Sequence, residues 1–505
     1  MRTWWERLPL QIYLKVVNLA IAMSKRAAED TQDIEGKNGP GRREAVSDSI
    51  DTEMGNFEDA YEDEFESEDE YLEADGKEDN EMEEAEEEED DSAARSAWLP
   101  GGVINEGEQL VVDPSAYDML HNMQVKWPFL SLDIIPDALG DERRSWPQEM
   151  YLAGGSQAIN NSENEVTVMK VSQLCKTKHD AENDEESDNS DVEDDPILEH
   201  RSIPTKGACN RIRASPVSTN DPQKKSFLAS FQETGKVHVW DIAPHLQSLN
   251  SPGNLVSRNQ NNPVHTVNQH KTEGYALDWS PFEYSLLSGD CANEIYLTRA
   301  TNTGWQTESS PFLDHTGSVE DIQWSPNEKT VFSSCSCDGT FRIWDVRNQK
   351  KTSALTVNAH PGVDVNVLSW NSRVPYLMAT GADNGVFNVW DLRSLKSSSA
   401  VATPVASFKW HQSAVTSIEW HPKEESVLAV AGADDQLSLW DLSVELDPEE
   451  QASRASEGLQ DVPPQLMFVH MGQSAIKELH WHKQIPGTIV STAQTGLNVF
   501  KTITF

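Results

Sequence analysis

Cysteine is scarce in this chain, and its distribution does not suggest a disulfide framework. The 505 residues contain five cysteines: Cys175, Cys209, Cys291, Cys335 and Cys337. An odd, scattered set in a chain of this length favours a reducing compartment. Cys335 and Cys337 share one face of a predicted strand, but two thiols with no second pair nearby do not form a zinc site. We interpret them as packing residues.

Basic residues are few relative to acidic ones. The chain has 40 Lys and Arg against 84 Asp and Glu, a formal net charge of -44. Residues 58–91 hold 22 acids and a single lysine, and residues 180–195 hold 10 acids with no lysine or arginine. Nucleic-acid binding needs clustered cations to neutralise phosphate, so no direct contact with nucleic acid is expected. The imbalance favours a basic protein as partner.

The chain also lacks a hydrophobic run long enough to cross a bilayer, so no membrane association is expected. Residues 1–22 are apolar, but Gln11, Lys15 and Asn18 interrupt them. We interpret residues 1–22 as an atypical N-terminal extension that comes from an upstream start of the gene model. A targeting peptide is the alternative.

Motifs for catalysis, metal binding or cofactor binding are missing as well. No HExxH occurs, and no glycine-rich phosphate loop precedes Gly235-Lys236. His480-Trp481-His482 places two imidazoles on one face of a strand, with no carboxylate or cysteine at ligand spacing. We therefore expect no metal, no cofactor and no enzymatic activity.

A repeated strand pattern is present, and residues 315–347 show it most clearly. Residues 319–324 alternate in character, residues 330–335 are rich in β-branched and aromatic side chains, and residues 340–344 form a third segment. Asp338-Gly339 between the last two predicts a tight type I′ hairpin turn, which needs positive φ at both central residues. Three hairpin-linked strands in about thirty residues predict an antiparallel, all-β structure.

The pattern recurs along the chain at a regular interval. Trp-Asp pairs begin at Trp240, Trp344, Trp390 and Trp440, and the last three are 46 and 50 residues apart. Residues 166–171, 294–297 and 497–500 occupy the equivalent place in degenerate repeats. This period is typical of the four-stranded blades of a propeller, and the count predicts seven blades.

The repeats resemble those of WD-repeat β-propellers. The resemblance implies that His315, Ser336, Asp338 and Trp344 form the hydrogen-bonded structural tetrad of one blade. A catalytic triad needs one positioned nucleophile in a cleft, whereas a His and Asp pattern shared by several blades indicates structure. The last repeat has only three clear strands, so residues 117–123 are expected to supply its fourth strand and close the ring.

The predicted domain organisation has three parts. Residues 1–22 are the atypical extension, residues 23–107 are an acidic tail expected to be disordered, and residues 108–505 are the propeller. Two acidic insertions break the repeat period: residues 176–200 between the first two blades, and residues 443–464 after the sixth. Ser67 and Ser190 precede acidic runs and resemble acidophilic kinase sites, where phosphate would add to the negative charge.

Three segments narrow the resemblance: residues 119–133, 210–213 and 462–470. They are similar to histone-binding WD-repeat proteins, in which the segment matching Pro463-Pro464 and the acids before it clasps a histone helix. The glutamate-rich tail and residues 477–505 more closely resemble the glutamate-rich WD-repeat family of ribosome assembly factors. That resemblance implies a nuclear and nucleolar chaperone for a basic ribosomal protein of the large subunit, number three.

Partner-binding residues are predicted on one face of the propeller and on one loop. Loops that lead into the first strand of three consecutive blades carry Glu273, Glu320 and Asp364. Circular symmetry brings such positions around one opening, where their fields add. The insertion at 443–464 and the strand after it supply the remaining candidates: Glu445, Asp447, Glu449, Glu450, Asp461, Pro463, Pro464 and Phe468.

Two other functions remain open at this point. The chain could be a histone-binding chromatin chaperone, which the similarity at residues 462–470 favours. It could also be a substrate receptor of a cullin-type ubiquitin ligase, because Arg347 and Arg393 end consecutive Trp-Asp-x-Arg boxes like those of propeller adaptors. Local ion pairs at the strand ends would explain both arginines equally well.

Overall fold

The computed structural model describes residues 112–177, 195–216, 226–251, 253–395, 402–445 and 462–505. These residues form 28 β-strands, the α-helix α2 (Ala243–Asn250) and four short 3-10 helices: η1 (Pro114–Ala116), η2 (Asn161–Glu163), η3 (Arg258–Asn261) and η4 (Leu392–Ser394). The extension predicted at 1–22 and the tail predicted at 23–107 lie outside the described residues, as do Ser67 and Ser190.

The strands form seven antiparallel sheets of four strands each, so the prediction of a seven-bladed, all-β propeller is confirmed. Blade 1 contains β2 (Phe129–Ile135), β3 (Gln148–Ser156), β4 (Glu165–Leu174) and β5 (Ile197–Pro204). Blade 2 contains β6 (Cys209–Ala214), β7 (Phe227–Gln232), β8 (Val237–Asp241) and β9 (His265–Val267). Blade 3 contains β10 (Ala276–Trp279), β11 (Ser285–Gly289), β12 (Ile295–Thr301) and β13 (Gly304–Thr307).

The remaining four blades follow the same order. Blade 4 contains β14 (Val319–Trp324), β15 (Val331–Ser336), β16 (Thr340–Asp345) and β17 (Leu355–Asn358). Blade 5 contains β18 (Val365–Trp370), β19 (Leu377–Ala382), β20 (Val386–Asp391) and β21 (Ala406–Lys409). Blade 6 contains β22 (Val415–Trp420), β23 (Val427–Gly432), β24 (Leu437–Asp441) and β25 (Leu466–His470). Blade 7 contains β26 (Glu478–Trp481), β27 (Thr488–Ala493), β28 (Gly496–Thr502) and β1 (Tyr117–Met123).

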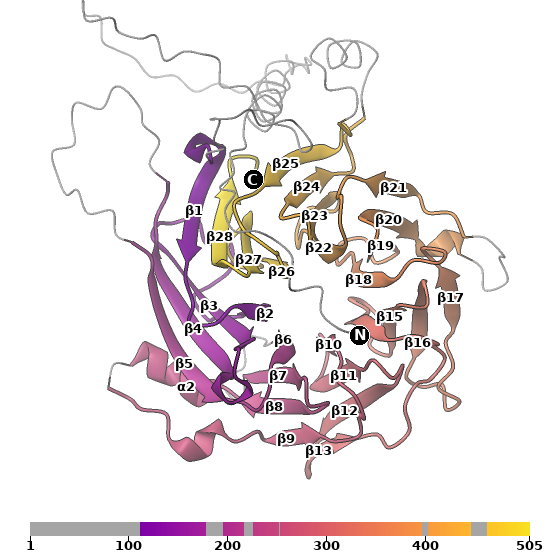
Figure 1. The fold of residues 1–505 in the computed structure, drawn as a ribbon, viewed down its shortest axis with the longest axis horizontal. Helices are drawn as coiled ribbons and strands as arrows, with labels where there is room; N and C mark the ends of the chain where they lie inside the picture. Colours follow the sequence, from indigo (N-terminus) through magenta and orange to yellow (C-terminus); the bar gives the residue numbers. More distant parts are fainter. Residues whose placement is uncertain (1–111, 178–194, 217–225, 252, 396–401, 446–461) are drawn as a thin grey trace, which may run out of the picture. The chain divides into compact units, whose positions relative to one another are not determined.

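The ring is closed by pairing the first strand of the chain with the last, as the sequence predicts. Strand β1 pairs antiparallel with β28, from Tyr117 opposite Thr502 to Met123 opposite Leu497. Figure 1 shows the indigo β1 beside the yellow β28. The Tyr117 hydroxyl also lies 2.8 Å from His470 Nδ1 in blade 6. Closure removes the free sheet edges that an open array would leave.

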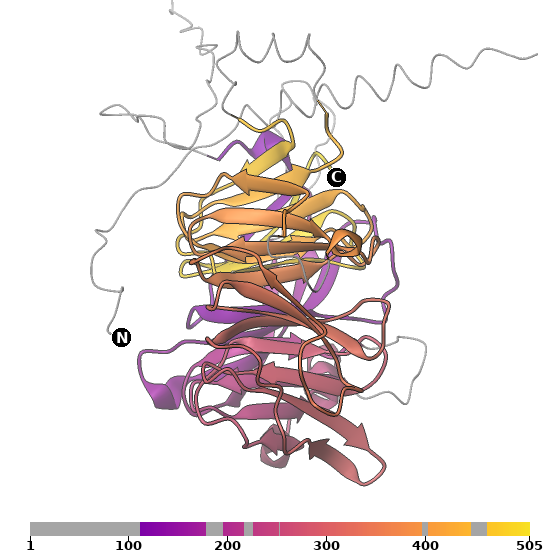
Figure 2. The same cartoon turned by 90° about the vertical axis from the view of Figure 1, so that its right-hand side faces the viewer.

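The first strand of each blade is the innermost one, and it defines two faces of the ring. First strands of neighbouring blades contact one another around the central channel. Figure 2 shows the blades from the side, with their strands running across the thickness of the ring. We call the face where the first strands begin the top face, and the face where they end the bottom face. Because successive strands are antiparallel, third strands also begin at the top and end at the bottom.

Both acidic insertions leave the bottom face within a blade, which corrects the prediction that they separate blades. Strand β4 pairs with β5 on the far side of the first insertion, and β24 pairs with β25 on the far side of the second. Each insertion therefore joins the third strand of a blade to the fourth. The Trp-Asp motif ends the third strand, so a boundary set at that motif misplaces the outermost strand. Residues 178–194 and 446–461 lie outside the described residues.

The blade 4 hairpin has a different turn from the predicted one. Gly339 has a φ of 79°, but Asp338 is not among the described residues with positive φ, so the turn is not type I′. The Asp338 carboxylate instead accepts hydrogen bonds from the Thr340 amide at 3.0 Å and the Thr340 hydroxyl at 2.6 Å. A turn followed by one left-handed glycine is the common three-residue alternative.

The structural tetrad of blade 4 contains Ser334, which corrects the prediction of Ser336. His315 Nε2 lies 2.8 Å from Ser334 Oγ, and the Trp344 indole donates to the same oxygen at 2.8 Å. His315 Nδ1 lies 2.9 Å from Asp338 Oδ2. Trp344 pairs with Phe332, so its indole nitrogen reaches the next residue on that face, which is Ser334. Ser336 lies at the turn and accepts the Asp338 amide at 3.1 Å.

Equivalent networks in other blades show that this arrangement supports the fold. In blade 3, His270 lies 2.9 Å from Asp290 and 2.7 Å from Ser288. In blade 6, His411 lies 2.9 Å from both Asp434 and Ser438. The imidazole of each network is buried, so each one satisfies polar groups inside a blade.

Candidate functional site

The top face carries the three acids that are predicted to lie together. Glu273 lies just before β10, Glu320 is the second residue of β14, and Asp364 lies just before β18. They come from blades 3, 4 and 5 at the ends where the first strands begin. We call these three residues the acidic rim.

The acidic rim is linked through shared neighbours. The Cys337 thiol donates to Glu320 Oε1 at 3.1 Å. Burial, followed by the charges of Glu320 and Asp364, raises the pKa of that thiol. Burial, with Glu273 next and Glu320 also contributing, raises the pKa of Tyr275 to about 12. Both shifts disfavour further negative charge, because the local field is already negative.

No cation within the described part of the chain forms an ion pair with the acidic rim. Glu273 accepts a hydrogen bond from the Asn210 amide at 3.0 Å, which is a neutral donor. Glu273 and Glu320 are half-buried and Asp364 is exposed. An acidic patch without internal counterions attracts a cationic partner from solution.

The candidate residues beyond the second insertion fall into three groups. Glu445 is exposed, and Pro463 and Pro464 are half-buried, next to the bottom end of β24. Asp447, Glu449, Glu450 and Asp461 lie outside the described residues. The flanks of this loop are on the bottom face, whereas the acidic rim is on the top face. The two predicted contact regions therefore do not meet at one edge.

Phe468 is a core residue and not a contact residue. It is only 2% exposed and packs against Tyr117, with ring centroids 5.3 Å apart. The prediction that it binds a partner comes from the match of its segment to the histone-binding family. Its side chain instead anchors β25 next to the closing blade.

A second polar cluster lies inside the channel and was not predicted from the sequence. Glu478, at the start of β26, is 1% exposed and accepts hydrogen bonds from Arg211 and Arg213, each at 2.7 Å. Its other oxygen accepts the Ser131 hydroxyl at 2.6 Å and the Leu132 amide at 2.9 Å. Burial opposes ionisation of Glu478, but Arg213 and Arg211 outweigh it and hold the pKa of its carboxyl well below the ordinary value.

His480 extends this cluster to blade 6. Its Nδ1 lies 2.8 Å from Glu419 Oε2, and its Nε2 lies 3.6 Å from Glu478 Oε1. Burial would lower the pKa of His480, but the charges and hydrogen bonds of Glu419 and Glu478 raise it to about 10. The imidazole is therefore charged at neutral pH. It joins blade 7 to blade 6, while Glu478 joins blade 7 to blades 1 and 2.

Sequence reasoning did not find this cluster because its partners are far apart in the chain. Glu478 is 267 residues from Arg211 and 265 from Arg213. In the sequence, residues 210–213 stand out only for their family likeness and His480 only as a weak metal candidate, without a link between them. Within the described residues, no group of His, Cys, Asp or Glu has the arrangement of a metal site. The described helices also include none suited to crossing a membrane.

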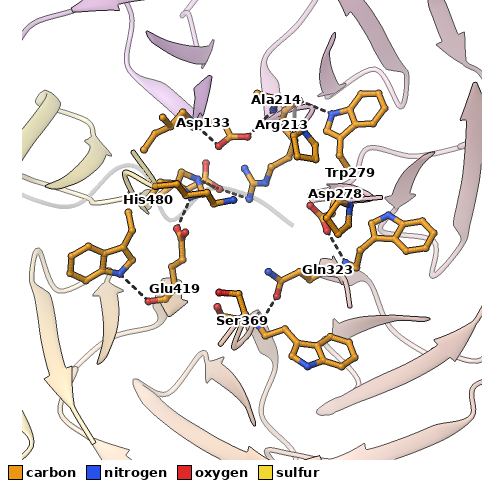
Figure 3. Close-up of a pocket in the computed structure, with 18 of the residues that line it drawn as sticks. Asp133, Arg213, Ala214, Asp278, Trp279, Gln323, Ser369, Glu419 and His480 are labelled. Carbon is orange, nitrogen blue, oxygen red and sulfur yellow. Dashed lines mark hydrogen bonds and ion pairs between the residues drawn. The ribbon is translucent and has the colours of Figure 1, made fainter. Parts of the chain in front are cut away.

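The channel cluster lines a cavity that opens near the bottom face, shown in Figure 3. Around it, polar side chains of one blade accept backbone N–H groups of the next. Asp278 accepts from the Trp324 amide at 2.7 Å, and Gln323 accepts from the Trp370 amide at 2.6 Å. These bonds fasten neighbouring blades and position the side chains that face the cavity.

Both candidate adaptor arginines form local ion pairs on the surface. The Arg347 Nε lies 3.0 Å from Asp345 Oδ1, and the Arg393 Nε lies 3.0 Å from Asp391 Oδ1. Arg393 also lies over the ring of Tyr376, with its guanidinium carbon 3.5 Å from the ring centroid. The side chains are 72% and 63% exposed, so a partner could reach either one.

Two family models match parts of the chain. The model of the histone-binding protein RBBP4, which also covers the equivalent member of the CAF1 complex, matches residues 107–175. The model described as "WD domain, G-beta repeat" matches residues 307–345 and 402–441. These matches cover the closing strand with the first blade and two of the clearest repeats.

Several curated proteins are similar over most of their length. The ribosome assembly protein rrb1 of Schizosaccharomyces pombe is 73% identical over 483 residues, covering 96% of this chain and all of the relative. The glutamate-rich WD repeat-containing protein 1 of Dictyostelium discoideum is 45% identical, covering 81% of this chain and 86% of the relative. The histone acetyltransferase type B subunit 2 of Candida glabrata is 24% identical, covering 76% and 84%. The chain therefore belongs to the glutamate-rich WD-repeat protein family, the family of the ribosome assembly protein rrb1.

Proposed function

We propose that this protein is a non-enzymatic ribosome biogenesis factor that chaperones a basic ribosomal protein of the large subunit. The similarity to a ribosome assembly protein supports the process. The partner we propose is large-subunit protein number three, and the proposed location is the nucleus and nucleolus. The observation that carries the binding role is the acidic rim, which has no counterion among the described residues.

The acidic rim and the acidic tracts have complementary tasks in this proposal. Residues 58–91 and 180–195 hold 22 and 10 acids, which raise the encounter rate with a cationic protein. The rim offers carboxylates held by three consecutive blades, so it provides a fixed docking surface. Shielding of cationic surface before assembly follows from both.

Reversal of the rim charge tests the docking surface. Replacing Glu273, Glu320 and Asp364 with lysine should abolish binding of the basic ribosomal protein without lowering the Tm by more than a few degrees. The matched control is lysine at Glu199, Glu283 and Glu328, which lie away from the rim. Normal binding by the rim variant, measured by isothermal titration calorimetry, would refute the docking surface.

Salt dependence and deletion of the tail separate steering from docking. Affinity should fall steeply above about 0.1 M salt, where the Debye length is about 10 Å. Deleting residues 58–91 should lower the association rate more than it raises the dissociation rate. An affinity that is constant up to molar salt would exclude an electrostatic chaperone.

The same acidic surface supports a second candidate, a chaperone for histones. The family model at residues 107–175 names histone-binding proteins. Competition between purified histones and the ribosomal protein for the wild-type chain discriminates the two, because the true partner should bind at least tenfold more tightly at equal salt.

A further inference from the structure

The cavity at the bottom end of the channel has the dimensions of a ligand site. Its volume is about 610 Å³, within the range of about 300–1,000 Å³ that small-molecule and side-chain pockets occupy. Residues from the first strands of all seven blades line it. It lies at the opposite end of the channel from the acidic rim, so the two regions can be tested separately.

Carboxylates outnumber charged basic groups on the cavity wall. The acidic side chains are Asp133, Asp141, Asp278, Asp321, Glu419 and Glu478. The basic ones are Arg211, Arg213, Lys483 and the charged His480. Both arginines are bonded to Glu478 and the imidazole to Glu419, so these cations are already engaged.

Asp278 and Asp321 form no ion pair with any residue in the described part of the chain. Asp278 accepts the Trp324 amide, and Asp321 accepts the Leu368 amide at 3.1 Å and the Ile322 amide at 3.0 Å. Figure 3 shows Asp278 at the cavity, across from Arg213. Two carboxylates that bond only to backbone N–H groups leave room for a cation in front of them.

The electrostatics of Asp278 agree with this geometry. Burial raises the pKa of Asp278 to about 7, and the groups facing it are Arg213 from β6, Asp321 from β14 and Lys483 beyond β26. Burial also raises the pKa of Asp321. The cations of the cavity therefore do not fully compensate these carboxylates, and a further cation would stabilise their ionised form.

The cavity wall also presents an N–H donor without an acceptor. His482 is 2% exposed, and its Nδ1 accepts the amides of Gln484 at 3.1 Å and Ile485 at 3.0 Å. The proton must then reside on Nε2, which has no hydrogen-bond partner. The indole N–H of Trp324, which is 3% exposed, is likewise unpartnered. Such buried donors call for a carbonyl oxygen or a water.

The remaining wall is apolar where the cavity opens. Prolines that follow the first strands contribute Pro136, Pro216, Pro281 and Pro326. A lysine or arginine combines a hydrocarbon stem with a cationic head, so it can contact apolar surface and a carboxylate together. A peptide carbonyl next to that side chain supplies the acceptor that the His482 donor lacks.

We infer that this cavity binds one basic residue of an extended peptide, with its cationic side chain against Asp278 and Asp321 and its peptide carbonyl at the His482 N–H. This inference rests on the proposed function for the identity of the protein that supplies the peptide. The pocket chemistry itself is independent of that identity. A phosphate ligand is disfavoured because both arginines are held by Glu478.

A short peptide tests the site directly. The probe is a capped Gly-Arg-Gly peptide, titrated into the full-length protein at pH 7 and compared with capped Gly-Gln-Gly. We expect binding of the arginine peptide only, weakened about tenfold or more in Asp278→Asn, which corresponds to loss of a charged hydrogen bond. The variant retains a carbonyl acceptor for the Trp324 amide, and its folding is checked by its Tm.

A proton count gives an independent readout. Binding of a cation should release a proton from Asp278 near pH 7, so the calorimetric enthalpy should vary with the ionisation enthalpy of the buffer. The variation should disappear in Asp278→Asn. Glu273→Gln, at the opposite end of the channel, is the matched control and should bind the peptide normally.

The outcomes distinguish this inference from the proposed function. Equal binding of the two peptides, no binding of the arginine peptide, equal affinity of Asp278→Asn and the wild type, or inorganic phosphate displacing the peptide would each overturn the cavity site. Peptide binding that persists while the ribosomal protein fails to bind would leave the cavity site standing and remove the proposed partner.

Discussion

Ser334 shows at the scale of one residue how a propeller blade satisfies its buried polar groups. Its hydroxyl lies within hydrogen-bond distance of the His315 imidazole and accepts the Trp344 indole N–H. Ser334 and Ser336 are both 0% exposed, so burial alone does not separate them. Their hydrogen-bond partners do, because only Ser334 joins two side chains from other strands.

Replacing each serine with alanine should therefore have unequal effects. Ser334→Ala leaves two buried N–H groups without a partner and should lower the free energy of unfolding by about 2–4 kcal/mol, at about 1–3 kcal/mol per unsatisfied group, less any relaxation. Ser336→Ala removes one turn hydrogen bond and should cost about 1 kcal/mol. Urea unfolding of both variants checks the order. A larger effect at Ser336 would show that the turn matters more than the tetrad.

His480 should make the stability of the propeller fall at high pH. Its folded pKa of about 10 lies above the ordinary value of 6.5, so its stabilisation is complete below about pH 6.5 and is lost as pH rises toward 10. One pKa unit corresponds to about 1.4 kcal/mol, so we expect a loss on the order of 3 kcal/mol.

A matched variant isolates the contribution of His480. The free energy of unfolding is measured from pH 6 to pH 10 for the wild type and for His480→Gln, which keeps a hydrogen-bond donor without the titration. The variant should be less stable at pH 6 and should lose less stability on the way to pH 10. Parallel profiles would mean that His480 is not charged in the folded protein.

At the scale of the strand, the end of the third strand holds a surface arginine in two consecutive blades. Arg347 and Arg393 each pair with the aspartate two residues earlier, at the bottom end of β16 and β20. Ion pairs this exposed add little stability. The geometry thus explains the two arginines structurally and still leaves them accessible to a ligase core.

A double Arg347→Ala, Arg393→Ala variant separates these roles. Its Tm should match that of the wild type, because both side chains are exposed and their ion pairs are screened by solvent. Binding to a cullin-type ligase core, measured by pull-down from the same lysate, should be lost if the chain is an adaptor. A folded variant that keeps every ligase contact removes the adaptor hypothesis.

At the scale of the whole molecule, ring closure depends on a strand that comes before the first blade. The core around this closure includes Tyr117, Phe468 and Phe500, which are all buried. Removal of β1 would expose the edge of β28 and uncover part of this core.

Two truncations test the closure. Removing residues 1–107 retains β1, so cooperative melting should persist with a Tm close to that of the full chain. Removing residues 1–123 deletes β1 and should lower the Tm by at least about 5 °C or cause aggregation. Differential scanning calorimetry measures both. Equal Tm values would show that the ring does not need the closing strand.

The sequence by itself determined the architecture and the class of partner. Trp-Asp pairs in register, with degenerate copies between them, specify seven blades because each repeat encodes one supersecondary unit. The shortage of one strand in the last repeat specifies residues 117–123 as its partner, because an unpaired edge is unfavourable. Net charge is a sum over residues, so an excess of acids can be read without a structure.

Only the tertiary structure decided which residues meet. Ser334 and Ser336 lie on the same strand face, so alternation could not choose between them, and the register with Trp344 did. Glu478 and Arg211 meet across 267 residues, because closing the ring brings blade 7 beside blades 1 and 2. The acidic rim and the channel cavity lie at opposite ends of the channel for a similar reason: strand direction, which the sequence pattern does not encode, sets the face on which each side chain lies.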